Sequence, residues 1–413
     1  MKTKIWLIIV FILLSFHIFL RFSDMEIKNP FAWDQVRDAW ISLDMIENNR
    51  YPLLGMVAKQ NTGIYLGPAY YYFILPFYYF KNLDPGASGV IAGVTSIITF
   101  LGLFFLVKNI FSLRVALFAI FINTIAMASI GFDRIQWSVA FFPLVSLAIF
   151  YALFKVISGN SKYIIFLSIL LGFSFHLHFT AVFFPIIILF SLPFFPKNKT
   201  TAKYVLASIP LLLIWFLPNI IAELQAKNVH TGNLLNYIGT YYHGFHLTRF
   251  LQLAPDALIQ FEPFLFPAVK ILKYAILPIF FFIYIHQKNN KSKVFCYLVF
   301  LWFLVPWIVF STYKGEISDY YFAINRYVVI ALLAYLFNFI FERKNIAVKA
   351  TLAISLCIYA YINMVNFFSY HADGGLKQNR ENVNKAIREG KIINFTEGDP
   401  ESYIYHIYTK KEQ

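Results

Sequence analysis

The sequence alternates long apolar runs with short polar segments. Runs of about 17 to 25 apolar residues can cross a bilayer as helices, because a helix satisfies its own backbone polar groups in lipid. Such runs lie near residues 5–21, 87–107, 115–131, 137–154, 163–176, 179–195, 204–222, 267–286, 294–311, 326–341 and 347–367. The pattern predicts an all-α polytopic membrane protein with about 11 transmembrane helices, within a range of about 10 to 12.

Basic residues gather on one side of the predicted spans. If the N-terminus is cytoplasmic, the inside segments contain Lys2, Lys4, Lys108, Arg114, Lys155, Lys162, Lys197, Lys199, Lys203, Lys288, Lys291, Lys293, Arg343, Lys344 and Lys349, with Glu342 as their one acid. Short loops rich in Lys and Arg face the cytoplasm in membrane proteins. We therefore expect a multi-pass protein of the cytoplasmic membrane with its N-terminus inside. The first span is predicted to stay as an anchor, since no small-residue cleavage site follows it.

Three segments are predicted to lie on the extracytoplasmic side. They are the first loop at 22–86, a second long loop at 223–266 and a C-terminal tail at 368–413. Residues 1–367 then form a transmembrane domain. The tail is too short to fold alone, and we expect it to dock on the outer face.

Some of these outer segments have recognisable local patterns. The first loop should hold amphipathic juxtamembrane helices, and its apolar stretch at 64–80 is placed on the outer surface, because a span there would reverse the charge rule. The tail is predicted as a helix at 377–388 followed by strand-like runs at 391–396 and 402–409.

Composition and charge exclude several classes of protein. The chain is 59% hydrophobic and 14% charged, whereas soluble domains carry about 25% charged residues. The net charge of +14 does not indicate a nucleic-acid partner, because the excess of basic residues lies in the short inside loops. No phosphate-binding glycine loop, nucleophile elbow or Cys-x-x-Cys pair is present. The inside loops are also too short for a nucleotide-binding domain.

The first loop carries the clearest candidate chemistry. Asp34, Arg37 and Asp38 lie at spacings of three and four, which places them on one side of a helix. A carboxylate there can act as a general base toward an acceptor hydroxyl. The alternative is a solvated acidic face with an ordinary Asp34–Arg37 ion pair, and spacing alone does not decide between them.

The order of several short motifs resembles a known superfamily. The motifs are Asp34 to Ala39, Tyr51 to Gly55, Gly67 to Tyr72, Trp137-Ser138, Leu177 to Thr180, and Asp319 to Tyr321 before Arg326. In this order, after one span and an acid-bearing loop, they resemble the GT-C polytopic membrane glycosyltransferases. The closest likeness is to the branch of protein O-mannosyltransferases and lipid A aminoarabinose transferase, a family 39-like group.

The resemblance implies a function and a base. The donor would be a sugar on a polyprenyl phosphate, and Asp34 would be the base of an inverting displacement toward a lipid, glycan or protein acceptor. Asp38 is the second catalytic candidate. Relatives often have an acid directly after the first one, whereas this chain has Gln35. That departure leaves open how the two aspartates divide the work and whether a divalent cation takes part; no other cofactor is implied.

Further residues could meet the phosphate and the acceptor. A lipid-phosphate leaving group needs fixed cations, and the outer-face candidates are Arg37, Lys59, Arg134, Arg249 and Arg326. Cations at span ends can equally be interface anchors. Acceptor or sugar contacts are expected from His178, Tyr70, Tyr320 and Tyr321. No metal site is predicted, because His176 and His178 would point to nearly opposite sides of a helix.

Two other functions compete with a glycosyltransferase. A transporter or flippase of lipid-linked glycans should have ionisable residues or broken helices at mid-membrane, whereas this chain keeps nearly all its charges in loops and at span ends. A non-catalytic scaffold of the cell envelope would not need Asp34.

Overall fold

The computed structural model describes residues 2–59, 62–286 and 290–410. Within them, eight helices are long and apolar enough to cross a membrane, or nine if one bent pair is counted as a span. These helices are α1 (Lys2–Phe22), α5 (Ala87–Ile110), η1 with α8 (Ser138–Phe141, Phe142–Ile157), α11 (Lys199–Gln225), η5 with α15 (Pro267–Leu272, Lys273–Ile285), α16 (Asn290–Ser311), η6 with α17 (Asp319–Asn325, Arg326–Phe341) and α18 (Ile346–Ser369). The predicted all-α polytopic class is confirmed.

The predicted count of 11 spans is not confirmed, because three apolar runs do not form long straight helices. The run at 163–176 forms only α9 (Tyr163–Ser174), and the run at 179–195 is divided among η2 (Phe179–Val182), α10 (Phe183–Ser191) and η3 (Leu192–Phe194). At 1.5 Å per residue, α9 is about 18 Å long, less than the hydrocarbon thickness of about 30 Å.

The third such run, at 115–131, is broken. Helices α6 (Leu113–Ile125) and α7 (Met127–Asp133) meet at an angle of 73°. Buried arginines bond backbone carbonyls on both sides of the break: Arg21 donates to Asn123 O (2.7 Å) and Thr124 O (2.6 Å) in α6, and Arg326 donates to Ala128 O (2.8 Å) in α7. Arg21 also pairs with buried Asp133 at 2.8 Å.

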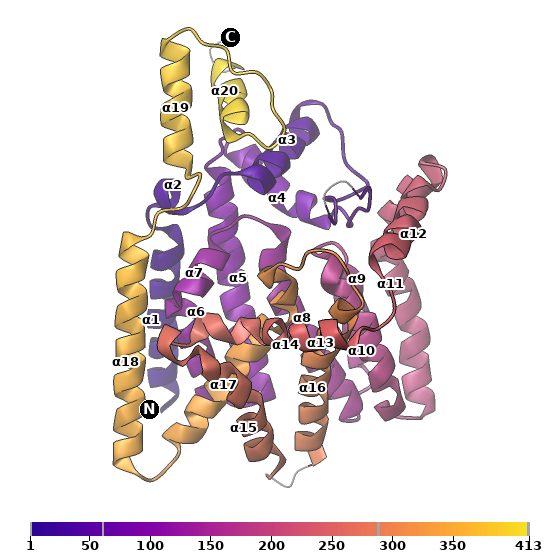
Figure 1. The fold of residues 1–413 in the computed structure, drawn as a ribbon, viewed down its shortest axis with the longest axis vertical. Coiled ribbons are helices and arrows are strands. Elements are labelled where there is room, and N and C mark those ends of the chain that lie inside the picture. Colours follow the sequence, from indigo (N-terminus) through magenta and orange to yellow (C-terminus); the bar gives the residue numbers. More distant parts are fainter. Residues whose placement is uncertain (1, 60–61, 287–289, 411–413) are drawn as a thin grey trace.

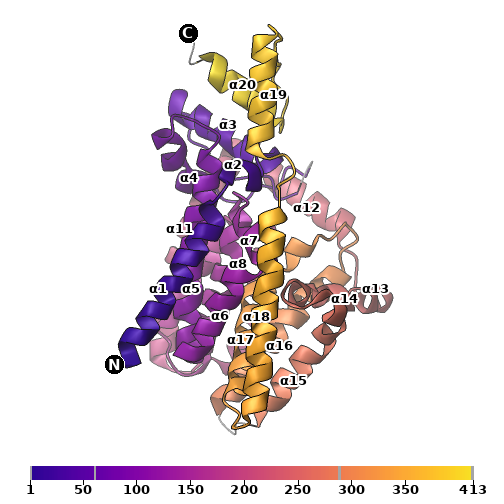
Figure 2. The ribbon, with the colours of Figure 1, turned by 90° about the vertical axis from the view of Figure 1, so that its left-hand side faces the viewer.

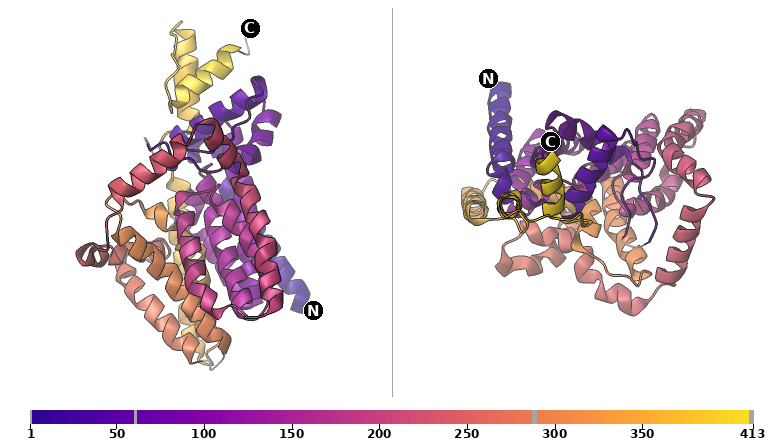
Figure 3. Two further views of the ribbon diagram at one scale, coloured as in Figure 1. Left: turned by 90° about the vertical axis from the view of Figure 1, so that its right-hand side faces the viewer. Right: turned by 90° about the horizontal axis from the view of Figure 1, so that it is seen from above.

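Burial separates the centre of the bundle from its lipid-facing rim. In the most apolar window of each helix, 83% of η1–α8 and 72% of η6–α17 are buried, against 6% of α11 and 11% of α18. Helices α1 and α18 run along one side (Figure 2), and α11 runs along the periphery elsewhere (Figure 3). Exposed apolar side chains on these outer helices suit a lipid solvent.

The helices of the first loop gather at the end of the bundle opposite the N-terminus, whereas most helices of the second loop lie lower along the bundle (Figure 1). The first loop forms α2 (Met25–Lys28), α3 (Trp33–Glu47) and α4 (Ala69–Phe80), and the second forms α12 (Val229–Tyr241), α13 (Leu247–Gln252), α14 (Ala254–Ala257) and η4 (Ile259–Phe264). With 12 residues, α4 is too short to span a membrane, as expected for a surface helix. Lys288, one of the predicted inside residues, lies outside the described part of the chain.

The tail differs from its prediction. It forms α19 (Leu376–Arg388) and α20 (Pro400–Lys410), so the strand-like run predicted at 402–409 is wrong: it is helical. Residues 391–396 have no regular structure. The physical reason lies at the helix start, where Asp399 accepts a hydrogen bond from Ser402 N (2.8 Å) and Pro400 takes the first helical position.

Candidate active site

Helix α3 presents the charged residues of the first loop. Its start is fixed by Gln35, whose side-chain oxygen accepts the Ala32 backbone N–H at 3.1 Å. Apolar residues at helical spacing, Val36, Ala39 and Leu43, are buried in the core that includes α4. The other face therefore carries Asp34 and Arg37.

Arg37 lies between the two aspartates and bonds both. Its Nη1 is 2.8 Å from Asp34 Oδ1, and its Nη2 and Nε are 2.8 Å and 3.0 Å from Asp38 Oδ1. The exposed fraction of the side chain is 46% for Asp34, 22% for Arg37 and 0% for Asp38. Among the described residues, Arg37 is the hydrogen-bond partner of Asp34, and it leaves Asp34 Oδ2 accessible.

Asp38 is enclosed in a polar network that sequence reasoning missed. Gln136 Nε2 donates to Asp38 Oδ2 at 2.8 Å, Tyr78 OH donates to Gln136 Oε1 at 3.0 Å, and Gln35 Nε2 donates to Gln136 O at 2.8 Å. Burial raises the pKa of Asp38 to about 6, although Arg37 opposes the shift. Gln136 belongs to no predicted motif, although it directly precedes Trp137-Ser138.

An aromatic group lies beside Asp34. Tyr320 is close enough to interact electrostatically with Asp34, and 37% of its surface is exposed. Its ring lies 5.5 Å from Trp137, 5.7 Å from His178 and 4.8 Å from Tyr321, between ring centroids. The structure thus brings three of the predicted acceptor or sugar residues together.

The remaining predicted acceptor residue and the histidines have other partners. Tyr70 is buried on α4 near Asp38, where burial raises its pKa. His178 Nδ1 lies 2.7 Å from Thr180 Oγ1, so its hydrogen bond goes to a hydroxyl and not to an aspartate. His176 Nε2 lies 2.8 Å from Trp215 O.

A second cluster of cations surrounds Tyr313. Lys59 Nζ donates to the Tyr313 hydroxyl, and Arg249 Nε donates to Tyr313 O at 3.0 Å. Tyr237 OH donates to the same hydroxyl at 2.9 Å, and Lys59 also lies over the Tyr241 ring. No ion pair joins either cation to a carboxylate within the described ranges. The cluster therefore brings two positive charges together beside tyrosines, and Arg249 also lies within electrostatic range of the Asp256 carboxylate.

Aromatic contacts connect this cluster to the neighbourhood of Asp34. Phe310 lies between Tyr313 and Tyr321, at centroid distances of 6.5 Å and 6.1 Å, and Tyr321 contacts Tyr320. Met56, three residues before Lys59, accepts a weak contact from Arg37 Nη2 at 3.9 Å. Buried aromatic side chains thus connect the neighbourhood of the α3 charges with the Tyr313 cluster.

Arg134 and Arg326, by contrast, are occupied by structural contacts. All three guanidinium nitrogens of Arg134 donate to backbone carbonyls, those of Leu20, Ser23 and Lys28. Arg326 is enclosed by the Phe132 and Phe264 rings and bonds Ala128 O. Phosphate binding by these two residues stays a prediction, and their contacts favour a role in holding the fold.

The carboxylates were also tested for a metal site. Across the described residues, no group of three or more His, Cys, Asp or Glu side chains could hold a metal ion. Arg37 occupies the space between Asp34 and Asp38 with its own positive charge. As arranged, this pair does not fit a divalent cation.

The arrangement of the helices is similar to that of several solved protein structures, each of which shares 13% or less of its residues with this chain. The predicted resemblance is confirmed at the level of the fold. No protein-family model and no curated protein sequence matches the chain.

Particular solved structures share this fold. One is ArnT from Cupriavidus metallidurans bound to undecaprenyl phosphate, with a TM-score of 0.57 and 10% identity over 98% of this chain and 75% of ArnT. Another is the Archaeoglobus fulgidus oligosaccharyltransferase complex with Zn and sulfate, with a TM-score of 0.57 and 13% identity over 97% of this chain and 56% of the enzyme. A third is AglB from the same organism in complex with an inhibitory peptide and a dolichol-phosphate, with a TM-score of 0.57, 13% identity and coverage of 98% and 60%. The chain spans less than two thirds of these oligosaccharyltransferases.

Proposed function

We propose that the protein is a membrane glycosyltransferase that moves a sugar from a polyprenyl-phosphate carrier to an acceptor, with Asp34 as general base. The observation that carries the proposal is the half-exposed Asp34 carboxylate, held by Arg37 through one oxygen and within electrostatic range of Tyr320, which is 37% exposed. The fold supports it, because ArnT, which shares the fold, binds undecaprenyl phosphate, and the oligosaccharyltransferase AglB binds a dolichol-phosphate.

The proposed reaction is an inverting displacement. The acceptor hydroxyl gives its proton to Asp34 Oδ2 while the acceptor oxygen bonds the anomeric carbon. The bond between that carbon and the phosphate oxygen breaks, and its electron pair stays on the lipid phosphate. Asp38 acts by positioning: it is fully buried and fixes Arg37, which in turn orients Asp34. The lipid, glycan or protein acceptor would lie over Tyr320 and Tyr321.

The donor phosphate is assigned to the Tyr313 cluster. Lys59 and Arg249 approach Tyr313 from different loops, and neither forms an ion pair with a carboxylate in the described structure. Fixed cations at this place would stabilise the charge that develops on the leaving phosphate. Arg37 is less suited, because two aspartates already neutralise it.

A flippase of lipid-linked glycans is the second candidate, and the broken helix pair α6–α7 is the observation that favours it. The break is, however, closed by internal hydrogen bonds from Arg21 and Arg326. That arrangement suits a fixed structural element better than a moving one.

One assay separates the two functions. Purified protein in liposomes is given radiolabelled polyprenyl-phosphate sugars and a native lipid extract. Asp34→Asn removes the base with little change in shape, so transfer should fall about 100-fold or more. Asp44→Asn, on the exposed part of the same helix, is the matched control and should transfer like wild type. Equal transfer by Asp34→Asn would refute the assigned base. Absence of transfer by folded wild type from every donor, with movement of the lipid-linked sugar across the bilayer, would support the flippase.

The phosphate assignment predicts a different kinetic change. Lys59→Ala and Arg249→Ala should each reduce kcat/KM for the donor by about 10- to 100-fold, because a charged hydrogen bond contributes about 1.5–3 kcal/mol. Lys314→Ala, next to Tyr313 but exposed, is the control. Unchanged donor kinetics in both variants would exclude the Tyr313 cluster as the phosphate site.

A further inference from the structure

The C-terminal tail covers the helix that carries the proposed base. Helices α19 and α20 stand over α3 at the end of the bundle opposite the N-terminus (Figure 1). One face of α3 packs into the core with α4, and the tail packs against the rest of the helix. The position of Asp34 is thus bounded by a segment that is more than 300 residues away in sequence.

Trp40 is the centre of the contact between α3 and the tail. Its ring centroid lies 5.2 Å from Phe395, 5.2 Å from Tyr403 and 5.1 Å from His406. Tyr403 is fully buried, and its hydroxyl donates to Leu83 O at 2.8 Å. This aromatic contact fixes α3 two residues beyond Asp38.

Gly398 makes a second contact at the opposite end of the charged segment. Its φ is +74°, a left-handed conformation that favours glycine. A Cβ at this position would overlap the indole ring of Trp33. Trp33 directly precedes Asp34 and is the first residue of α3. The glycine therefore lets the tail lie directly on the start of the helix.

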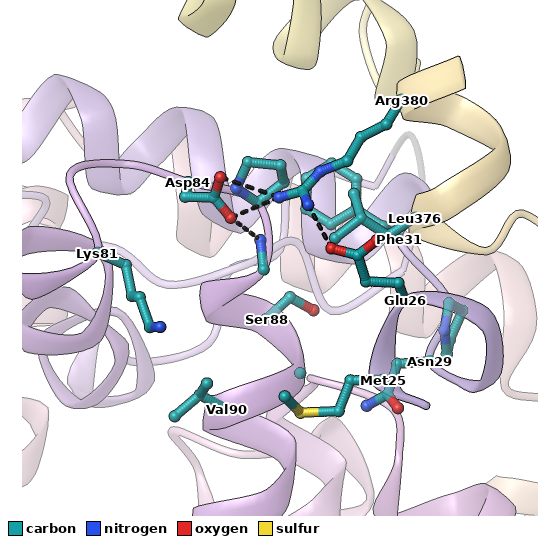
Figure 4. A pocket seen from close by; sticks show the side chains of 14 residues that line it. Met25, Glu26, Asn29, Phe31, Lys81, Asp84, Ser88, Val90, Leu376 and Arg380 are labelled. Atoms are coloured by element: carbon teal, nitrogen blue, oxygen red, sulfur yellow. Dashed lines mark hydrogen bonds and ion pairs between the residues drawn. The ribbon is translucent and has the colours of Figure 1, made fainter. Parts of the chain in front are cut away.

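Polar contacts bind the tail to segments that come before and after α3 in the sequence. Arg380 Nη2 donates to both carboxylate oxygens of Asp84, at 2.7 Å and 2.9 Å, and Arg380 Nη1 bonds Glu26 (Figure 4). Asn379 Nδ2 donates to Phe31 O at 3.3 Å. The Arg380 contacts form one wall of a cavity of about 360 Å³ between α2, α5 and α19. The tail thus joins α2 to the segment that precedes α5.

We propose that the tail sets the position of Asp34, with Arg380 and Gly398 as positioning residues. This inference rests on the proposed function of Asp34. Neither residue touches the reacting atoms. Both act through α3, whose inner side is held by the Asp38–Gln136 bond and whose outer side is held by the tail. A shift of about 1 Å in a reacting group can cost about 100-fold in rate, so loss of the tail contacts should slow the chemical step.

The test uses the full chain in liposomes. Arg380→Ala and Gly398→Leu are compared with Arg388→Ala, which changes an exposed residue of the helix that carries Arg380. They are also compared with Arg380→Lys, which keeps the charge but lacks the two separate nitrogens that bond Asp84 and Glu26. The measurements are kcat and KM for the donor, and hydrogen exchange of the amides of α3. We expect kcat to fall about 10- to 100-fold in Arg380→Ala and Gly398→Leu, with KM changed less than about threefold. Hydrogen exchange of the α3 amides should be faster in the same two variants. Arg380→Lys should recover part of kcat, and Arg388→Ala should match wild type.

Several results would decide against the inference. Wild-type kcat in both Arg380→Ala and Gly398→Leu would overturn it, even with faster exchange in α3, because the tail would then stabilise without positioning. A rise in KM alone would also overturn it. If folded wild type transfers no sugar but Arg380→Ala still loosens α3, the proposed function fails while the hold of the tail on α3 stands.

Discussion

At the scale of single residues, burial distinguishes Asp34 from Asp38. Both bond Arg37, but Asp34 is 46% exposed and Asp38 is enclosed with Gln136. The sequence placed both carboxylates on one helical face. It could not rank them, because the difference depends on Gln136, which reaches Asp38 from a distant segment. An accessible carboxylate suits a base, and a buried one suits an anchor for Arg37.

The raised pKa of Asp38 predicts a pH dependence. Burial raises that pKa to about 6, so the ionised fraction increases as pH rises through 6. Protonation removes the charge that holds Arg37, and transfer should therefore decline below about pH 6 and level off above about pH 7. The measurement is kcat/KM between about pH 4.5 and about pH 8. Asp38→Asn should lower kcat/KM above about pH 6, approach the wild-type value below it and lose this decline at acid pH. The same decline in Asp38→Asn would assign it to another group.

At the scale of elements, the main surprise is the break between α6 and α7. The apolar run at 115–131 predicted one straight span, and no proline marks the break at Ala126. Arg21 and Arg326 come from distant helices and bond backbone carbonyls on either side of the break. Hydrophobic periodicity cannot reveal such long-range hydrogen bonds. The same limit applies to the tail, where the run at 402–409 has β-type residues but forms a helix.

The Arg21–Asp133 pair should matter strongly for stability. Arg21→Met leaves a buried carboxylate unpaired, and removal of one partner of a buried pair costs about 3–5 kcal/mol. Changing both partners, as Arg21→Met with Asp133→Leu, should recover part of that loss. The measurement is the unfolding midpoint in detergent. Arg114→Ala breaks an exposed pair with Glu342 and should cost less than about 1 kcal/mol. Equal losses of unfolding free energy in Arg21→Met and Arg114→Ala would contradict a stabilising role for the Arg21–Asp133 pair.

At the scale of the whole molecule, the fold places α3, α4 and the tail together at one end and the N-terminus at the other (Figures 1 and 3). The positive charge of the opposite loops predicts that this end faces away from the cytoplasm. The asymmetry of charge predicts how the protein is oriented in the membrane, whereas the packing of the helices decides which residues lie at each end.

Cysteine labelling tests this orientation in cells. In a chain with Cys296 and Cys357 replaced by alanine, Asn236→Cys on exposed α12 should react with a membrane-impermeant maleimide in intact cells. Asn160→Cys, in the exposed turn after α8, should react only after permeabilisation. The reverse pattern would invert the topology and place Asp34 on the cytoplasmic side.

The sequence by itself determined the membrane class, most spans, the charge asymmetry and the helix with Asp34, Arg37 and Asp38. These features follow from local hydrophobicity and helical spacing, which need no knowledge of distant contacts. Only the tertiary structure decided the break at Ala126, the enclosure of Asp38 by Gln136, the Tyr313 cluster and the hold of Gly398 on Trp33. Each of these depends on residues brought together from separate segments by packing.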